Sequence, residues 1–136
     1  MKSRATLAAG ASCVLLFLAA GCGTEDDRPP TFTYVYETVI AHNCATIGCH
    51  NSFRQTAGLQ FNTKTGAYLG LTGTACNDND EYEANNFVVA GRPDSSQVIH
   101  MMRGDDVARR MPPDRGISSV DIALVEDWIL EGAKCD

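Results

Sequence analysis

Apolar residues recur at helical spacing soon after residue 31. Val35, Val39 and Ile40 lie one or four positions apart instead of alternating, so they favour one face of a helix over residues 32–43. A shorter helix of one or two turns is predicted over residues 65–71. The N-terminal part of the domain therefore favours helices over strands.

The helical pattern is clearest near the C-terminus. Ser118 with Asp121 three residues later resembles a capping box, and Ile117 and Ile122 are spaced as a hydrophobic staple. Gly132 is the expected stop. The apolar stripe that follows the cap consists of Ile122, Leu124, Val125, Trp128 and Ile129. Such a stripe needs a partner, and the first predicted helix, at residues 34–43, is the expected one.

One further helix is predicted between the short helix at residues 65–71 and the C-terminal one. Ser95 or Ser96 is its expected cap, it runs through Val98, Ile99 and Met102, and Gly104 closes it. Residues 72–86 are rich in Asp, Asn, Gly and Thr and predict a surface loop, and residues 87–90 predict an extended apolar strip. With no alternating strand series and no repeat, the fold class predicted is all-α, with three to five short helices joined by irregular loops.

The first residues have the pattern of an export signal. Lys2 and Arg4 precede an apolar run over residues 7–20, which is too short to span a bilayer comfortably. Residues 18–22, which end in Cys22, resemble a bacterial lipobox, whose cysteine is diacylated and becomes the new N-terminus. An ordinary signal peptide and an uncleaved anchor are the alternatives.

This interpretation divides the chain into three parts. Residues 1–21 form a signal peptide of the lipoprotein type, residues 22–31 a lipidated N-terminus with a flexible tether, and residues 32–136 one small domain. The expected location is the bacterial cell envelope, anchored by lipid and facing the periplasm. Gly23 stands where inner-membrane lipoproteins of well-studied bacteria have aspartate, which favours the outer membrane.

The charge balance limits the class of partner. Removing Lys2 and Arg4 from the 11 basic residues leaves nine against 17 acidic ones, a formal charge of about −8. Such a surface disfavours nucleic acid, whose phosphates need lysine and arginine. It suits a protein partner with a basic docking patch.

Cys44, Cys49 and His50 form the most informative cluster. Two cysteines followed directly by a histidine are typical of c-type haem attachment, in which the thiols bind the haem and the imidazole binds iron. The usual spacing has two residues between the cysteines, whereas this chain has four, so the extra pair is expected to bulge out. The rival interpretation is a short-loop disulfide between Cys44 and Cys49 and no haem.

Met111 is a candidate for the opposite side of the iron. It precedes Pro112 and Pro113, which exclude a helix there, and a thioether on such a strap can bind haem iron. The alternative is that Met111 fills a gap in the core. Arg109 or Arg110 is expected either to pair with a haem propionate or to be solvated.

Other candidates near haem are assigned structural roles. His100 and Met102 are expected to pack on their helix, and His42 to end the first one.

The cysteine count leaves one further pair. Of six cysteines, Cys13 lies in the signal, Cys22 is assigned to lipid, and the motif cysteines are assigned to haem. Cys76 and Cys135 then remain as a disulfide in an oxidising compartment.

Together these segments resemble the small c-type cytochrome domains of exported bacterial proteins, especially lipoproteins. The resemblance covers roughly residues 34–134 and rests on the cysteine and histidine cluster, residues 57–61, 89–96, 110–113 and 118–121, and the closing helix at residues 128–133. It implies a class I cytochrome c-like fold with one covalent haem c. By the same resemblance Cys44 and Cys49 are attachment points, His50 the proximal iron ligand and Met111 the distal one.

The expected function is electron transfer to and from a redox partner protein by Fe(II)/Fe(III) cycling, as a carrier and not an enzyme. One alternative is a haem-free lipoprotein of the same fold, held by two disulfides, with a binding or assembly role. A weaker one is a haem sensor or peroxidase-like site with a displaceable Met111.

Overall fold

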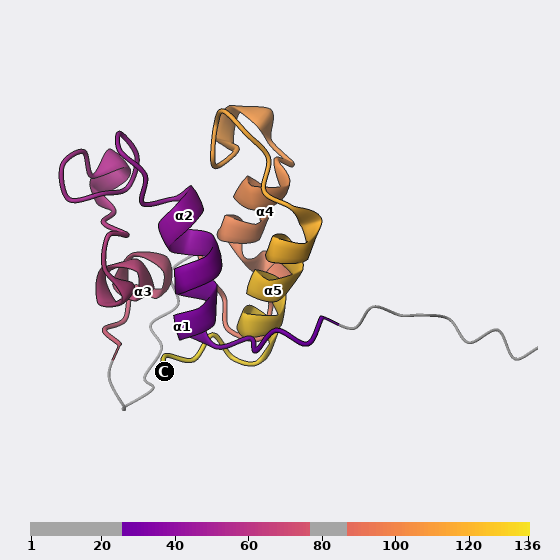
Figure 1. Cartoon of the computed structure of the whole chain (residues 1–136). Helices are drawn as coiled ribbons and strands as arrows, with labels where there is room; N and C mark the ends of the chain where they lie inside the picture. The colour runs from indigo at the N-terminus through magenta and orange to yellow at the C-terminus, as the bar shows by residue number, and fades with distance from the viewer. Residues whose placement is uncertain (1–25, 77–86) are drawn as a thin grey trace, which may run out of the picture.

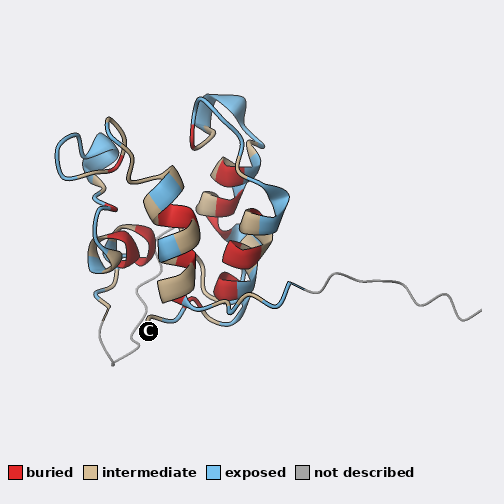
Figure 2. Ribbon diagram, in the orientation of Figure 1, coloured by how far each residue is buried: buried red, intermediate tan, exposed pale blue. Residues whose placement is uncertain are grey.

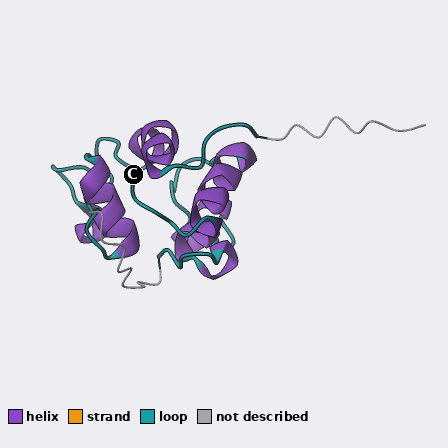
Figure 3. Cartoon of the chain, turned by 90° about the horizontal axis from the view of Figure 1, so that it is seen from below, coloured by secondary structure: helices purple, strands orange, loops and turns teal. Residues whose placement is uncertain are grey.

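The computed structural model describes residues 26–76 and 87–136 (Figure 1). The predicted signal peptide, Cys22 and most of the predicted polar loop lie outside these residues. The described part consists of helices and loops and contains no strand, which confirms the all-α prediction (Figure 3). Among the described residues, no helix has the length and apolar character needed to cross a bilayer.

The helices begin and end close to the predicted positions. The first is continuous from residue 32 to residue 43 and comprises α1 (Phe32–Val35), a π-helical middle part (Tyr36–Ile40) and α2 (Ala41–Asn43). The others are α3 (Lys64–Thr72), α4 (Gln97–Arg103) and α5 (Ser119–Leu130). Short 3-10 turns occupy Thr56–Gly58, Pro93–Ser95 and Val107–Arg109.

The two ends of α5 follow their predicted signals. The Ser118 hydroxyl accepts a hydrogen bond from the backbone N–H of Asp121 at 3.1 Å. At the other end Gly132 has a φ of +102°, its N–H donates to the carbonyl of Ile129, and the N–H of Ala133 donates to that of Trp128. This pair of bonds is the Schellman arrangement, in which a residue without Cβ takes the left-handed position.

The cap of α4 differs from its prediction. Ser96 is the N-cap residue, but its hydroxyl does not cap the helix. It accepts instead from the N–H of Val89 at 2.8 Å and donates to the carbonyl of Arg92 at 3.0 Å. Ser96 therefore fixes the apolar segment over residues 87–90 against the start of α4.

The first helix lies between α3 on one side and the pair α4 and α5 on the other (Figure 1). Helix α5 contacts both α1 and α4, which confirms the partner predicted for its apolar stripe. Phe32 is fully buried at the centre, with its ring 5.0 Å from the rings of both Tyr68 and Trp128. The buried residues accordingly line the facing sides of the helices (Figure 2).

The C-terminal segment is attached to the domain by a disulfide and by hydrogen bonds. A disulfide joins Cys76 to Cys135, as the cysteine count predicts. Trp128 Nε1 donates to the carbonyl of Lys134 at 2.9 Å, and the Tyr68 hydroxyl donates to that of Ala133 at 3.0 Å. Lys64 of α3 donates to the carbonyl of Asp136, and the N–H of Thr33 donates to its carboxylate, so the C-terminus lies beside α3 and the first helix (Figure 3).

Arg28 fixes part of the predicted tether to the domain. Its guanidinium donates to the Asp121 carboxylate at 2.9 Å and to the carbonyl of Val120 at 2.7 Å. It also forms an ion pair with Asp26 at 2.6 Å. The segment before α1 is therefore held against the first turn of α5, a contact that its polar, proline-containing composition does not indicate.

Candidate functional site

The four predicted haem-site residues line one cavity. It has a volume of about 210 Å³ and lies where the loop after α2 faces the loop between α4 and α5. Its lining consists of Asn43, Cys44, Gly48, Cys49, His50, Arg54, Thr56, Met111, Pro112 and Pro113. Folding therefore brings Met111 to the Cys44, Cys49 and His50 cluster from 61 positions further along the chain.

A second cavity, of about 120 Å³, shares two of these residues with the first. His50 and Met111 line both, and the remaining walls of the second cavity are apolar. Those walls consist of Ala57, Leu59, Phe61, Leu71, Phe87, Val98, Met101 and Met102. His50 and Met111 therefore stand between a partly polar space and an apolar one.

Hydrogen bonds give the four residues between the cysteines a compact turn. The N–H of Cys44 still donates to the carbonyl of Ile40 at 2.8 Å, so this thiol sits at the end of the first helix. The N–H of Cys49 donates to the carbonyl of Thr46 at 3.0 Å, and that of His50 to the carbonyl of Cys44 at 3.1 Å. The two additional residues between the cysteines thus form part of a turn, and this turn places His50 next to the end of the first helix.

The chain after the cluster is fixed by Asn51. Its side-chain oxygen accepts from the N–H groups of Phe53 and Arg54, and its amide nitrogen donates back to the carbonyl of Thr46. This Asx-type arrangement replaces helix or sheet bonds within the loop. Arg54 is thereby held where it lines the larger cavity.

The ring of Phe61 packs against the ring of His50. The two ring centroids are 4.8 Å apart, and the N–H of Phe61 donates to the carbonyl of His50 at 2.6 Å. Phe61 itself packs on α3 at Gly70, where an added Cβ would lie 2.8 Å from the phenyl Cε1. The absence of a side chain at Gly70 therefore allows Phe61, and with it His50, its position.

His50 is almost completely buried, with 9% of its surface exposed. Its Nδ1 has no hydrogen-bond partner, which is uncommon for a buried polar atom. Burial lowers the pKa of His50, while the neighbouring backbone of Thr56 and Leu59 opposes the shift. The imidazole is consequently neutral near pH 7, the form that binds metals.

Cys44 and Cys49 are free thiols in this structure. Cys44 is partly buried and packs against the core. Burial, and secondarily the neighbouring Cys49, raises the pKa of Cys44 to about 11, while Arg115 acts in the opposite direction. Cys44 is therefore protonated at neutral pH.

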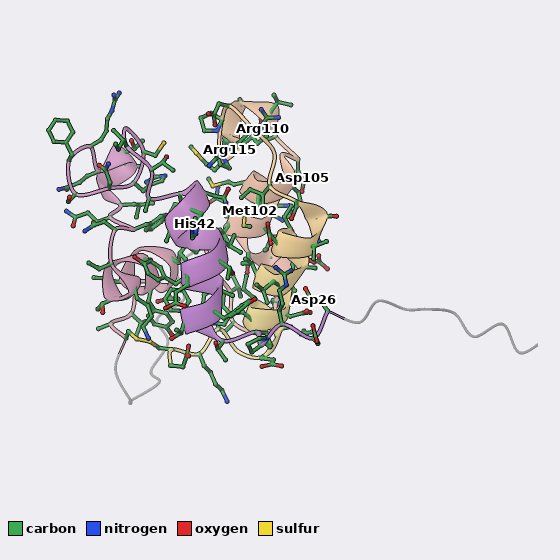
Figure 4. The ribbon with its side chains drawn as sticks, viewed as in Figure 1. Asp26, His42, Met102, Asp105, Arg110 and Arg115 are labelled. Carbon is green, nitrogen blue, oxygen red and sulfur yellow. A yellow bond between two sulfur atoms is a disulfide. The ribbon has the colours of Figure 1, made fainter. Side chains whose placement is uncertain are left out.

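The segment that carries Met111 is attached to two helices. The N–H of Met111 donates to the carbonyl of Met101 on α4 at 3.0 Å, and Arg115 donates to the carbonyl of His42 on α2 at 3.2 Å. Arg110 and Arg115 lie on this segment, above Met102 of α4 and His42 at the end of the first helix in the view of Figure 4. The segment thus spans the top of the space between the two helices.

Arg110 braces the same segment from within. It donates to the carbonyl of Pro113 at 2.9 Å, whereas its Nε is buried and has no partner. At Gly104 an added Cβ would lie 2.9 Å from Cδ of Arg110. Gly104, with a φ of +76°, therefore both ends α4 and leaves room for Arg110.

The remaining candidates have structural roles, with one correction. His100 was expected to pack among apolar neighbours, and this is wrong. Its ring is exposed and contacts the Asp105 carboxylate at 2.7 Å and the carbonyl of Asp94 at 3.0 Å, because it lies on the solvent side of α4. Met102 is buried in the core, as expected.

Two further predictions concern surface residues. His42 is exposed at the helix end, as expected, and Arg109 pairs with Asp106 at 3.0 Å. The sequence reasoning missed the contribution of Arg54 and the contact of Phe61 with His50. The only signal for Phe61 was its place in residues 57–61 of the family resemblance.

Comparison with protein families gives a match over the candidate site. The family model described as Planctomycete cytochrome C matches residues 47–115, half of the chain. This range includes Cys49, His50 and Met111. No curated protein and no solved structure matches the chain.

Proposed function

This chain belongs to the Planctomycete cytochrome C family, whose domain implies electron transfer by haem, and from this premise we propose that it is a lipid-anchored monohaem c-type cytochrome facing the periplasm. Family membership favours an electron carrier over an enzyme. The covalent attachment points, the iron ligands and the lipid anchor are the proposed details.

The residues at the site fit a haem c. His50 is buried and neutral, with an unpartnered nitrogen, and among the described residues no carboxylate lines either cavity that it borders. Thioether, imidazole and thiol groups converge there, a donor set suited to haem iron and to haem attachment. Neither cysteine is consumed by a disulfide.

The proposed roles follow from this placement. Cys44 and Cys49 would attach the haem, and His50 and Met111 would hold its iron. When bound, the haem supplies an iron that alternates between the ferrous and ferric states. Because His50 and Met111 would both bind the iron, no position on it would be left for a substrate.

Neighbouring residues hold these ligands in place. Phe61 packs against the imidazole of His50, and the carbonyl of Met101 accepts from the N–H of Met111. Arg110 has a buried Nε without an acceptor, and Arg54 lines the cavity, so both offer guanidinium groups to carboxylates such as the haem propionates. Such bonds would remove the desolvation cost of the Arg110 nitrogen.

The observation on which the proposal depends is the convergence of Cys44, Cys49, His50 and Met111 on one cavity. The segment that carries Met111 is hydrogen-bonded to α4 on one side of that cavity and to α2 on the other. The fold therefore fixes the position of this segment beside the cavity.

Expression in a host with a cytochrome maturation system tests the haem. We expect a coloured protein, a pyridine haemochrome spectrum and a mass increase of one haem. Met111→Ala should remove the far-red absorption of the ferric form and lower the reduction potential, since methionine ligation raises it. Met102→Leu is the matched control and should keep both properties.

A colourless protein with Cys44 joined to Cys49 would contradict the proposal. It would favour the haem-free lipoprotein held by two disulfides.

The proposed location has a separate test. The Cys76–Cys135 disulfide and the cytochrome c family support a site outside the cytoplasm. The lipid at Cys22 is proposed from the sequence, and metabolic labelling with a fatty-acid probe should mark the native chain but not Cys22→Ala. Equal labelling of both would refute the anchor.

A further inference from the structure

We propose that Gly70 of α3 is a positioning residue for the iron ligand His50. By leaving room for the ring of Phe61, Gly70 fixes the orientation of the His50 imidazole and, through it, the ligand field and the reduction potential of the haem iron. This inference rests on the proposed function. It assigns a role in electron transfer to a helix that lies outside the cysteine and histidine cluster.

The backbone does not explain a glycine at this position. Gly70 lies inside α3, two residues before the helix ends at Thr72. Its φ is not positive, whereas six other glycines of the described residues have a positive φ. Alanine is a much better helix former than glycine. The reason for a glycine here is therefore sought in the space that a side chain would occupy.

That space is filled by two side chains of the segment over residues 59–61. A Cβ on Gly70 would lie 2.8 Å from Cε1 of Phe61 and 3.3 Å from Cδ2 of Leu59. The first separation is far below van der Waals contact between carbon atoms. Because the phenyl ring is rigid, the ring of Phe61 would have to move as a whole.

Helix α3 is anchored on its other side and is not free to give way. It lies against the first helix (Figure 1). Ala67 is fully buried there, and the ring of Tyr68 packs on that of Phe32 with their centroids 5.0 Å apart. The disulfide between Cys76 and Cys135 holds the chain shortly after the helix. A side chain at Gly70 would therefore displace Phe61 and not α3.

A displacement of Phe61 is transmitted directly to His50. The centroids of the two rings are 4.8 Å apart, and the N–H of Phe61 donates to the carbonyl of His50 at 2.6 Å. Both residues are buried, and both line the apolar cavity of about 120 Å³. A displaced Phe61 ring therefore either pushes the imidazole or enters that cavity, and both movements change the packing of His50.

The His50 ring depends on such packing for its orientation. Its Nδ1 is buried and has no hydrogen-bond partner, so this nitrogen does not fix the ring plane. The groups around a metal-binding histidine set its orientation and its strength as a donor, and an apolar surrounding keeps water from the metal. Packing and burial around an axial ligand are in turn among the factors that set the potential of a haem.

The test compares the intact haem-bearing protein with Gly70→Ala, Phe61→Leu and the variant that carries both changes. Electron paramagnetic resonance of the ferric form gives the g values, which report the orientation and donor strength of the axial ligands, and a redox titration gives the potential. Gly70→Ala should shift both. Leucine has no Cε1 atom, so Gly70→Ala added to Phe61→Leu should cause no further shift. Such non-additivity is the signature of two residues in contact.

Gly116→Ala is the matched control. It makes the same change where no atom lies within 4 Å of the new Cβ and where φ is not positive, so the g values and the potential should stay native. Native values in Gly70→Ala would overturn the inference while leaving the cytochrome assignment intact. Equal shifts by Gly70→Ala with Phe61 and with leucine at that position would overturn it too.

A change that only unfolds the protein is recognised separately. The urea midpoint is measured for every variant. If Gly70→Ala does not fold, the variant with Phe61→Leu should restore folding and the haem spectrum, because it removes the overlap. Failure of this rescue would overturn the inference. A colourless native protein would overturn both this inference and the proposed function.

Discussion

Folding should slow the reaction of Cys44 with iodoacetamide by at least about tenfold near pH 8 in the haem-free protein. Cys44 lies at the end of the first helix, packs against the core and has a pKa raised to about 11 from an ordinary value of 9.0. This prediction concerns the thiol whose spacing departs from the usual haem-attachment motif.

The magnitude follows from the fraction of thiolate. At about pH 8, a shift of the pKa from 9.0 to about 11 lowers the thiolate fraction by about 100-fold. The more basic thiolate is also the better nucleophile, and with a Brønsted slope of about 0.45 this returns about eightfold. The net slowing is therefore about tenfold before steric shielding is added.

The assay follows alkylation by mass spectrometry in the variant Cys49→Ala, which isolates Cys44 and keeps the disulfide. Burial is the first cause of the raised pKa, so most of the shift should survive this substitution. The same variant in concentrated guanidinium chloride provides the unfolded rate. Equal rates in the folded and unfolded protein would refute the burial argument, and with it the placement of Cys44 against the core.

Three further predictions concern stability. Replacing Cys76 and Cys135 with alanine should lower the free energy of unfolding by about 4 kcal/mol on the chain-entropy model for a loop of about 60 residues, measured by urea denaturation, and a change below about 1 kcal/mol would contradict it. Phe32→Ala should cost about 3–5 kcal/mol because a fully buried ring is lost, with Phe32→Leu as the milder control, and equal urea midpoints for the two would contradict the packing. The hydrogen bond to Asp105, and then that to the carbonyl of Asp94, raises the pKa of His100, so its stabilisation is complete below the unfolded pKa of about 6.5 and is lost as pH rises through the folded value. His100→Gln should remove that pH dependence from the urea midpoints, and an unchanged dependence would rule His100 out as its source.

The helices could be predicted because their signals are local. The stripe from Ile122 to Ile129, the Ser118 cap and the Gly132 stop lie within a few turns of one another, and each acts through neighbouring backbone groups. The pairing of α5 with the first helix follows because each has one apolar face to bury.

Contacts between distant segments were harder to predict. Phe61 packs on His50 because Gly70, on another element, leaves space for its ring. The spacing of residues in the sequence carries no sign of that juxtaposition. His100 was misplaced because the apolar residues beside it suggest burial, whereas the phase of α4 turns its ring toward Asp105 in solvent.

The residues of the candidate site could be predicted where their side-chain chemistry, and not their packing, identifies them. The order of Cys44, Cys49 and His50 in the sequence indicates haem attachment, and the prolines after Met111 indicate a rigid segment. The bonds that place this segment, from Met111 to Met101 and from Arg115 to His42, join groups far apart in sequence and required the structure.

Because Arg28 is held against α5, only the segment between Cys22 and Arg28 could serve as a linker between a lipid on Cys22 and the domain. Six peptide steps separate these two residues, which limits the contour to about 20 Å. If a lipid on Cys22 held the domain to a membrane, Arg28 and the first turn of α5 would stay within that distance of the bilayer. Partners would then meet the domain close to the membrane, because the linker could not carry it further away.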